Sequence, residues 1–294
     1  EGSLGTSRLD DTSGADGLFL DITDIKADLG GRRMINKIVD SGTFDGQLYA
    51  APYYAGGRIV FYTPQIVTGE LPATLDDYVA DGVAMKTATV SGIYAPGKDW
   101  YNALPYIWAH GGELAVKDGD KWDAQFSSDK SVEGLKQLQE VYLKATNAPA
   151  DGDEANLQVP FCAGEVGFLS APGWVKWSIL TPADDAKAPG CPDTFGKDLA
   201  AFPLPGLKAG ETAPIFAGGS NVAVAAKSKS PEMAKAALKV LLSSGYQELM
   251  AAGGLTPGII SAASALPKDA ITQAQATALA NSKGLLRTLQ GIAY

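Results

Sequence analysis

The chain has 294 residues, 46% hydrophobic and 19% charged, which is a composition typical of a globular protein long enough for two domains. Its net charge is −9, and the densest cationic cluster (Arg32, Arg33 and Lys37) is diluted by acidic neighbours. An acidic surface repels phosphate backbones and anionic membranes, so the charge argues against nucleic-acid binding. No apolar run approaches the roughly 18 residues that span a bilayer.

The N-terminal part of the chain predicts loops and short elements. Residues 1–17 are rich in Gly, Ser, Thr and Asp, and the segment lacks the positive start and apolar stretch of a secretion signal. A short strand or turn is expected over 17–22, followed by a helix over 31–39. Phe44–Tyr49 predicts a hairpin with Asp45-Gly46 as its turn, and Arg58–Tyr62 predicts a strand.

Two further helices are predicted in the first half of the chain. Thr74 is placed to cap a helix that begins near Leu75 and runs towards Gly82. A longer helix is expected over 129–145, because apolar residues recur there at three- and four-residue spacing. These residues are Val132, Leu135, Leu138, Val141 and Tyr142.

Helices and strands alternate along the rest of the chain. Ser230 as the cap and Pro231 at the first position predict one helix, and a second is expected from Gly245 to the Gly253-Gly254 stop. Strands are expected over 166–169, 199–202 and 221–225. This alternation predicts α/β lobes.

The sequence offers little support for catalysis. His110 is the single histidine and lies beside two glycines, and neither a Gly-x-Ser-x-Gly elbow nor a phosphate-binding loop occurs. Too few His and Cys residues exist for a metal site of that type, so we expect neither a cofactor nor a metal. The 33 acidic residues leave a glycoside-hydrolase pair of carboxylates open as an alternative.

The two cysteines, Cys162 and Cys191, do not form a metal-type Cys-x-x-Cys pair. One interpretation is a pair of buried thiols. In an exported protein the same pair is more often one disulfide, which stabilises by roughly 3–4 kcal/mol in the chain-entropy model.

Aromatic residues cluster beside Gly, Pro, Asn and Asp rather than at helix or strand period. Aromatic rings next to hydrogen-bonding side chains suit a sugar, which has apolar C–H faces and polar edges. Trp100 and Trp174 are the predicted stacking residues, whereas Trp108, Trp122 and Trp177 are predicted to serve packing.

Several short stretches, in this order, resemble family 1 extracellular solute-binding proteins of the maltose-binding type. They are Asp45–Pro52 with Val60–Tyr62, Leu71–Asp77, Trp100–Leu114, Phe161–Phe168 with Ala171–Trp174, and Ala201–Gly206 with Phe216–Asn221. The resemblance covers about residues 17–260. It implies an α/β, two-lobed periplasmic-binding-protein-like fold (class II type) whose lobes are joined by crossing hinge strands. Lobe I is expected to comprise 1–55 with 219–265, and lobe II 56–218 with 266–294.

The resemblance also implies a set of ligand-binding residues. Two crossings and the second lobe are expected to supply Tyr53, Tyr54, Arg58, Asp99, Trp100, Tyr101, Asn102, Trp174, Gly218, Gly219, Ser220 and Asn221. Arg58, Asp99, Asn102 and Asn221 are expected to read hydroxyl positions. Gly56 departs from the acidic residue that maltose-type members can carry, which argues against maltose.

The function implied is capture of a neutral sugar or oligosaccharide and its delivery, by cleft closure, to the permease subunits of an ABC importer. We expect a monomeric, non-enzymatic protein outside the cell, either a membrane-anchored lipoprotein of a Gram-positive bacterium or periplasmic. A sugar-binding sensor or adhesin is a further alternative. The family's first strand–helix–strand unit has no counterpart before Gly17, and the C-terminal helices are cut short after about Asn281, so we expect part of the site to lie outside this sequence.

Overall fold

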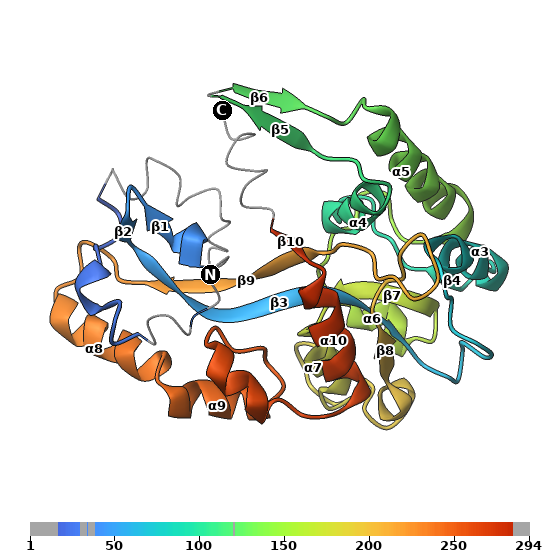
Figure 1. Cartoon of the computed structure of the whole chain (residues 1–294). Helices are drawn as coiled ribbons and strands as arrows, with labels where there is room; N and C mark the ends of the chain where they lie inside the picture. The colour runs from blue at the N-terminus through green and yellow to red at the C-terminus, as the bar shows by residue number, and fades with distance from the viewer. Residues whose placement is uncertain (1–16, 30–33, 35–38, 120, 285–294) are drawn as a thin grey trace. The chain divides into compact units, whose positions relative to one another are not determined.

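The computed structural model describes residues 17–29, 34, 39–119 and 121–284, and the chain forms two compact units (Figure 1). Unit 1 takes residues 1–56, 217–268 and 284–294, and unit 2 takes residues 57–216 and 269–283. The chain passes between the units inside strands β3 (Ala50–Tyr62) and β9 (Phe216–Ala223), which are neighbours in one sheet. A mixed α/β architecture with crossing strands is therefore confirmed.

Unit 2 is built around a sheet in which β3 is the antiparallel partner of both β7 (Val166–Pro172) and β8 (Ala200–Phe202). Strand β4 (Ser91–Ile93) pairs with β7 in parallel. The helices of this unit are α3 (Leu75–Met85), α4 (Leu104–Ala109), α5 (Asp129–Glu140), α6 (Gln158–Cys162), α7 (Val175–Leu180) and α10 (Ala270–Ala280). Unit 2 also contains a two-stranded hairpin, formed by β5 (Ala115–Asp118) and β6 (Lys121–Ala124). The short strand β10 (Lys283–Gly284) begins with the last residue of this unit.

Both faces of this sheet are buried. Val60 of β3 lies in a core with residues of α3, α4 and α5, whereas its neighbours Ile59 and Phe61 lie in a second core with residues of α6, α7 and α10. Adjacent strand residues point to opposite faces, so a strand covered on both sides is apolar throughout. This explains why Arg58–Tyr62 lacks the polar alternation of a half-exposed strand.

Unit 1 has its own smaller core, which includes Ile22, Leu48, Val224 and Leu238. Its elements are the hairpin β1 (Thr43–Phe44) and β2 (Gln47–Leu48), helices α8 (Pro231–Leu241) and α9 (Ser244–Ala252), and short 3-10 turns. Two ion pairs join α8 to the segment that begins with the 3-10 turn Thr23–Ile25. They are Lys235 with Asp24 at 2.8 Å and Lys239 with Asp28 at 2.7 Å.

Most predicted elements are present. Asp45 and Gly46 both have positive φ angles (45° and 80°), as a two-residue hairpin turn requires. Thr74 caps α3 in a capping box with Asp77. The predicted helix over 31–39 falls largely on residues outside the described ones.

Several boundaries and one cap differ from the prediction, and β3 begins at Ala50 rather than at Arg58. The helix over 129–145 changes at Val141 to a π-helical turn that ends at Ala145. Strand β9 begins at Phe216, five residues before the predicted start. Ser230 occupies the N-cap of α8, but its side chain accepts no capping hydrogen bond. In the described part of the chain, no helix combines the length and apolarity needed to cross a membrane.

Candidate functional site

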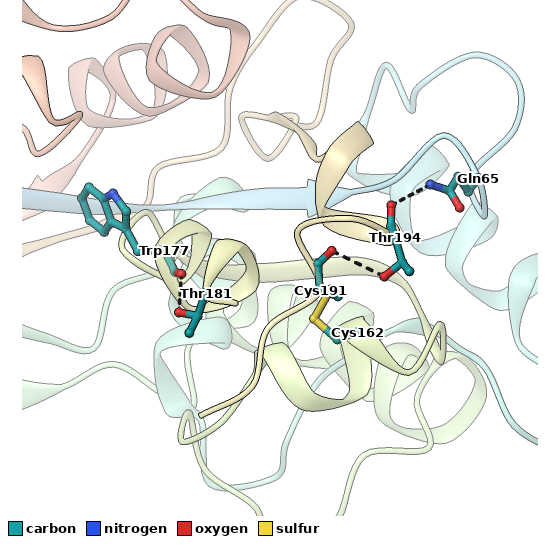
Figure 2. The surroundings of a disulfide bond; sticks show 6 residues. All are labelled: Gln65, Cys162, Trp177, Thr181, Cys191 and Thr194. Atoms are coloured by element: carbon teal, nitrogen blue, oxygen red, sulfur yellow. Dashed lines mark hydrogen bonds between the residues drawn. A yellow bond between two sulfur atoms is a disulfide. The ribbon is translucent and has the colours of Figure 1, made fainter. Parts of the chain in front are cut away.

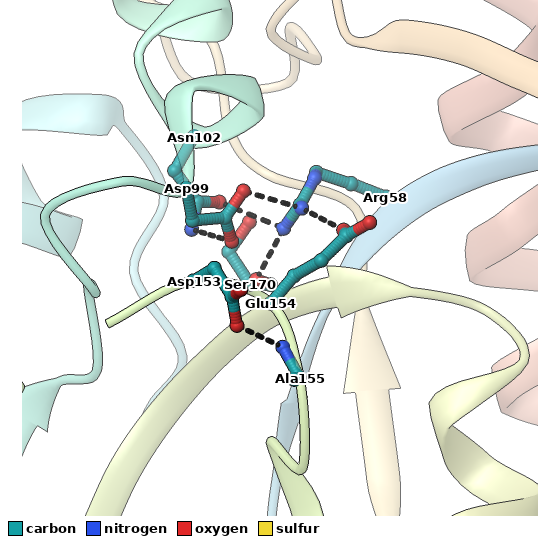
Figure 3. A network of polar contacts seen from close by, with 7 residues as sticks. All are labelled: Arg58, Asp99, Asn102, Asp153, Glu154, Ala155 and Ser170. Carbon is teal, nitrogen blue, oxygen red and sulfur yellow. Dashed lines mark hydrogen bonds and ion pairs between the residues drawn. The ribbon is translucent and has the colours of Figure 1, made fainter. Parts of the chain in front are cut away.

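Arg58 organises a buried polar network in unit 2 (Figure 3). Its guanidinium donates to Asp99 Oδ1 at 2.7 Å, Glu154 Oε2 at 2.8 Å, Asn102 Oδ1 at 3.2 Å and the Ser170 carbonyl at 2.9 Å. Asn102 in turn donates to Asp99 Oδ2 at 2.9 Å. Arg58, Asp99 and Asn102 therefore satisfy one another, and each is at least 94% buried as a residue.

Burial and two neighbouring charges act on the pKa of Asp99 in this network. Burial raises the pKa of Asp99 above its ordinary value, Arg58 opposes that shift, and the charge of Glu154 adds to it. A carboxylate that leaves water loses solvation, and only a close cation with good hydrogen bonds offsets the loss. Arg58 supplies that cation from strand β3, directly after the crossing point at Gly57.

An aromatic ladder lies beside the network. Trp100 stacks on Tyr101 with ring centroids 4.0 Å apart, and Tyr101 stacks on Phe216 at 5.1 Å. The Arg58 guanidinium lies 5.4 Å from the centroid of the Tyr101 ring, within cation–π range. Trp100 remains 43% exposed, so the ladder ends in an indole that a ligand can reach.

The Arg58 network holds the backbone turn that carries Trp100 and Tyr101. Asp99 and Asn102 flank Trp100 and Tyr101 in a single 3-10 turn, and both side chains are held by Arg58. Pairing a buried charge with fixed partners makes the turn rigid. The structure therefore brings Arg58, Asp99, Trp100, Tyr101 and Asn102 together, as the sequence-based set requires, but it buries the three polar members.

Unit 1 places the predicted tyrosines in a separate group. Tyr53 and Tyr54 meet edge-to-face with ring centroids 6.2 Å apart, and the Tyr53 hydroxyl shares a 2.9 Å hydrogen bond with the Tyr246 hydroxyl. That bond is the main reason why the pKa of Tyr53 rises from 10.0 to about 12. The fully buried Gln247 holds this segment by donating to the Tyr53 carbonyl at 3.1 Å.

The predicted glycine segment forms the unit 1 part of β9. Gly219 has φ +139°, and a Cβ there would lie 2.2 Å from the Tyr54 carbonyl oxygen, so only glycine fits against the neighbouring strand. Gly218 is half-buried and Ser220 is exposed. Asn221 donates to Ser41 Oγ at 2.7 Å, and its Oδ1 is buried without a partner among the described residues.

The remaining tryptophans separate by exposure. Trp174 is 41% exposed at the N-cap of α7. Trp177 is 38% exposed and has the Lys176 ammonium 4.9 Å from its ring centroid. Trp108 is buried, as predicted, and Trp122 is half-buried on β6.

Cys162 and Cys191 form a disulfide bond, with Cα atoms 5.4 Å apart, which confirms the disulfide interpretation (Figure 2). Cys162 is the last residue of α6. The Cys191 amide donates to the Ile179 carbonyl at the end of α7. The bridge therefore fastens the segment that follows α7 to α6.

The residues of these groups that were not predicted include Glu154, Phe216 and Tyr246. Glu154 lies in the acidic stretch Asp151-Gly-Asp-Glu, which in the sequence looks like a solvated loop. Phe216 directly precedes the Ala217-Gly218-Gly219 segment, and this position beside a predicted binding segment could have identified it. Tyr246 has no sequence signal, because its partner Tyr53 is 193 residues away.

The described residues contain no cluster of three or more His, Cys, Asp or Glu side chains that suits a metal ion. His110 caps α4, and its ring nitrogens lie 3.0 Å from Gln137 Oε1 and 3.8 Å from Glu133. Neither partner is a Ser, Thr or Cys side chain that the imidazole could activate as a general base. The site described above combines the exposed indole of Trp100 with the partly exposed carboxylate of Glu154.

The chain belongs to the family of bacterial extracellular solute-binding proteins, whose sequence pattern it matches over residues 8–279. Among curated proteins it is similar to the diacetylchitobiose binding protein DasA of Streptomyces coelicolor, with 34% identity over 272 residues. That match covers 89% of this chain and 61% of DasA. The chain thus spans less than two thirds of this relative's length.

Solved structures show the same fold at low identity. The GacH receptor of Streptomyces glaucescens, studied unliganded and with acarbose, matches with TM-score 0.79 and 17% identity over 98% of this chain and 76% of its own. A maltotriose-binding protein of Thermus thermophilus matches with TM-score 0.74 and 20% identity over 95% and 72%. The two-lobed fold of the maltose-binding type is therefore shown, and these relatives are binding proteins.

Proposed function

We propose that this chain captures a carbohydrate outside the cell for delivery to an ABC importer. The observation that carries this is the ladder Trp100–Tyr101–Phe216, whose exposed indole is backed by the buried group Arg58, Asp99 and Asn102. Indole faces complement the C–H faces of pyranose rings, and a rigid platform loses little entropy when a ligand binds.

The ligand class proposed is a neutral oligosaccharide that carries N-acetylated amino sugars. The name of DasA specifies diacetylchitobiose, and DasA is 34% identical to this chain, whereas GacH and the maltotriose-binding protein are 17% and 20% identical. The net charge of −9 is consistent with a neutral ligand, because anionic sugars meet long-range repulsion.

The proposed site keeps the twelve predicted positions and divides their roles. Trp100 and Trp174 offer exposed rings, and Tyr53, Tyr54 and the segment from Gly218 to Asn221 belong to unit 1. Arg58, Asp99 and Asn102 act by positioning the ladder, since their polar atoms are already used inside the protein. Cleft closure is part of the proposal: a sugar with higher affinity for the closed state shifts the protein towards that state.

The partners and location follow from the family. We propose that the closed protein docks on permease subunits, works as a monomer and carries out no chemistry on the sugar. We propose a location outside the cytoplasmic membrane: either a lipid-anchored protein on a Gram-positive cell or a periplasmic protein.

A thermal-shift screen tests the proposal. The protein, including any flanking segments of its natural precursor, is tested with diacetylchitobiose, cellobiose, xylobiose and maltose. A ligand at about 100 times its Kd adds about 2.7 kcal/mol of stability, a shift of several degrees at this size. No shift with any sugar, in a protein shown to be folded, would refute carbohydrate capture.

The variant Trp100→Ala should reduce the shift, whereas Trp177→Ala should preserve it. Both replace a tryptophan of similar exposure in unit 2, 43% against 38%, and the ladder includes only Trp100. Equal loss in both variants would show that stability, and not stacking, was disturbed.

A further inference from the structure

Glu154 is the one polar member of the Arg58 network that reaches solvent. Its side chain is 39% exposed, whereas the side chain of Asp99 is fully buried and that of Arg58 is 4% exposed. Oε2 accepts from Arg58 at 2.8 Å, and Oε1 has no hydrogen-bond partner in the part of the chain that the structure describes. One carboxylate oxygen is therefore available to a ligand.

The loop that carries Glu154 is fastened to the segment that leads into Trp100. The Gly97 amide donates to the Pro149 carbonyl at 3.1 Å, and the Lys98 amide donates to the Gly152 carbonyl at 2.8 Å. A Cβ at Gly97 would lie 2.1 Å from the Ala150 carbonyl oxygen, so the two backbones are in close contact. The segments that carry Glu154 and Trp100 are thus joined by backbone contacts. Burial raises the pKa of Tyr101, and the charge of Glu154 is close enough to the ladder to add to that shift.

The charge on Glu154 is only partly neutralised. Arg58 carries one positive charge and is ion-paired with both Asp99 and Glu154, and no other cation forms an ion pair with Glu154 among the described residues. Asp99 uses both of its oxygens inside the network. The residual negative charge therefore lies on the exposed carboxylate, where it meets the solvent beside the ladder.

We propose that Glu154 determines the sugar specificity of this site: it accepts a hydrogen bond from a hydroxyl or acetamido N–H of the sugar at Trp100, and it excludes anionic sugars. An ionised carboxylate only accepts hydrogen bonds, so it binds a ligand group that donates one and repels the negative charge of a uronate. This inference rests on the proposed carbohydrate function and assigns the choice between neutral and anionic sugars to Glu154.

The substitution Glu154→Gln isolates this role. The amide oxygen of glutamine still accepts from Arg58, so the network keeps its shape, while the outward atom changes from an acceptor to an N–H donor. The matched control is Asp153→Asn on the same loop. Asp153 Oδ1 accepts from the Ala155 amide at 2.8 Å, and the substitution changes the local charge equally without touching Arg58 (Figure 3).

The experiment is titration calorimetry of the wild-type protein and both variants, with diacetylchitobiose as the neutral ligand and digalacturonic acid as the anionic one. Glu154→Gln should weaken diacetylchitobiose binding about 10- to 100-fold, the range for a lost charge-assisted hydrogen bond. The same variant should lower the ratio of the affinity for diacetylchitobiose to the affinity for digalacturonic acid by at least about ten-fold, because it removes the like charge that repels the anionic sugar. Asp153→Asn should change both affinities by less than about two-fold.

The outcomes separate the two hypotheses. Failure of the wild-type protein to bind any sugar overturns the carbohydrate function, and this inference with it. Wild-type binding with equal behaviour of Glu154→Gln and Asp153→Asn overturns the role of Glu154 alone. A general loss of affinity in Glu154→Gln with an unchanged neutral-to-anionic ratio also overturns it, because that result indicates a structural contribution.

Discussion

Arg58 shows how a residue's environment decides its role. A lone arginine beside aromatic residues in a sequence suggests a ligand-binding group, because five N–H donors suit sugar hydroxyls. In the structure its two terminal nitrogens donate to four acceptors inside unit 2, so the side chain holds the ladder in place. The sequence-based expectation that Arg58, Asp99 and Asn102 read sugar hydroxyls stays a prediction, and the exposed carboxylate of this group belongs to Glu154.

The tyrosine pair of unit 1 gives a prediction about pH. Tyr246→Phe should lower the pKa of Tyr53 from about 12 towards 10.0, because the hydrogen bond to Tyr246 is the largest cause of the shift. The raised pKa contributes stability that is fully present below pH 10.0 and is lost as the pH rises through about 12. Tyrosinate absorbance during an alkaline titration measures it. Tyr54→Phe is the control and should leave the titration of Tyr53 unchanged; an unchanged Tyr53 in Tyr246→Phe would contradict the assignment.

The two predicted helix caps, Thr74 and Ser230, differ in what their side chains do. Thr74 and Asp77 form a reciprocal capping box on α3, with the Asp77 amide donating to Thr74 Oγ1 at 3.1 Å. Ser230 occupies the same kind of position on α8 without a capping bond. Pro231 at the first position already removes one unpaired N–H, so α8 begins without that help.

Thr74→Ala should therefore destabilise the protein by about 1 kcal/mol, and Ser230→Ala should have an effect near zero. Urea denaturation midpoints, at a constant m value, measure the difference. Equal destabilisation by the two substitutions would show that the cap geometry does not control stability here.

The disulfide gives a second prediction at this scale. Its 29-residue separation corresponds to about 3–4 kcal/mol in the chain-entropy model. The double variant Cys162→Ala/Cys191→Ala should lower the unfolding free energy by that amount, and the same variant should be insensitive to reductant. Wild-type protein treated with reductant is the control and should match it. A double variant as stable as the oxidised protein would refute the contribution.

At the scale of the whole molecule, the chain crosses between its two units inside long strands. Residues 56 and 57 of β3 and residues 216 and 217 of β9 mark the crossings. The sequence-based division at 55/56 and 218/219 remains a proposal for the functional lobes. Strands that continue across a boundary permit rigid-body motion of the units about a few backbone positions.

Sugar binding is expected to compact the protein. Small-angle X-ray scattering with saturating diacetylchitobiose should show the radius of gyration falling towards about 19 Å, the value for a compact chain of this length. Trp100→Ala at the same sugar concentration should show a smaller decrease. Binding detected by calorimetry without any change in the scattering curve would contradict closure.

The sequence by itself determined the parts of this protein that depend on neighbouring residues. The Asp45-Gly46 turn, the Thr74 cap and the apolar strand before Tyr62 are local, because a few adjacent residues set the backbone angles or the burial pattern. The aromatic residues at loop positions also identified the ladder residues Trp100 and Tyr101.

The tertiary structure alone decided which side chains are buried and which are presented. The side-chain partners of Arg58 lie 41, 44 and 96 residues away, and Tyr246 lies 193 residues from Tyr53. Such pairs form only when sheet pairing and helix packing bring distant segments together, and no local pattern encodes them. For this reason the choice between a binding role and a positioning role for Arg58, and the exposure of Glu154, follow from packing and not from the sequence pattern.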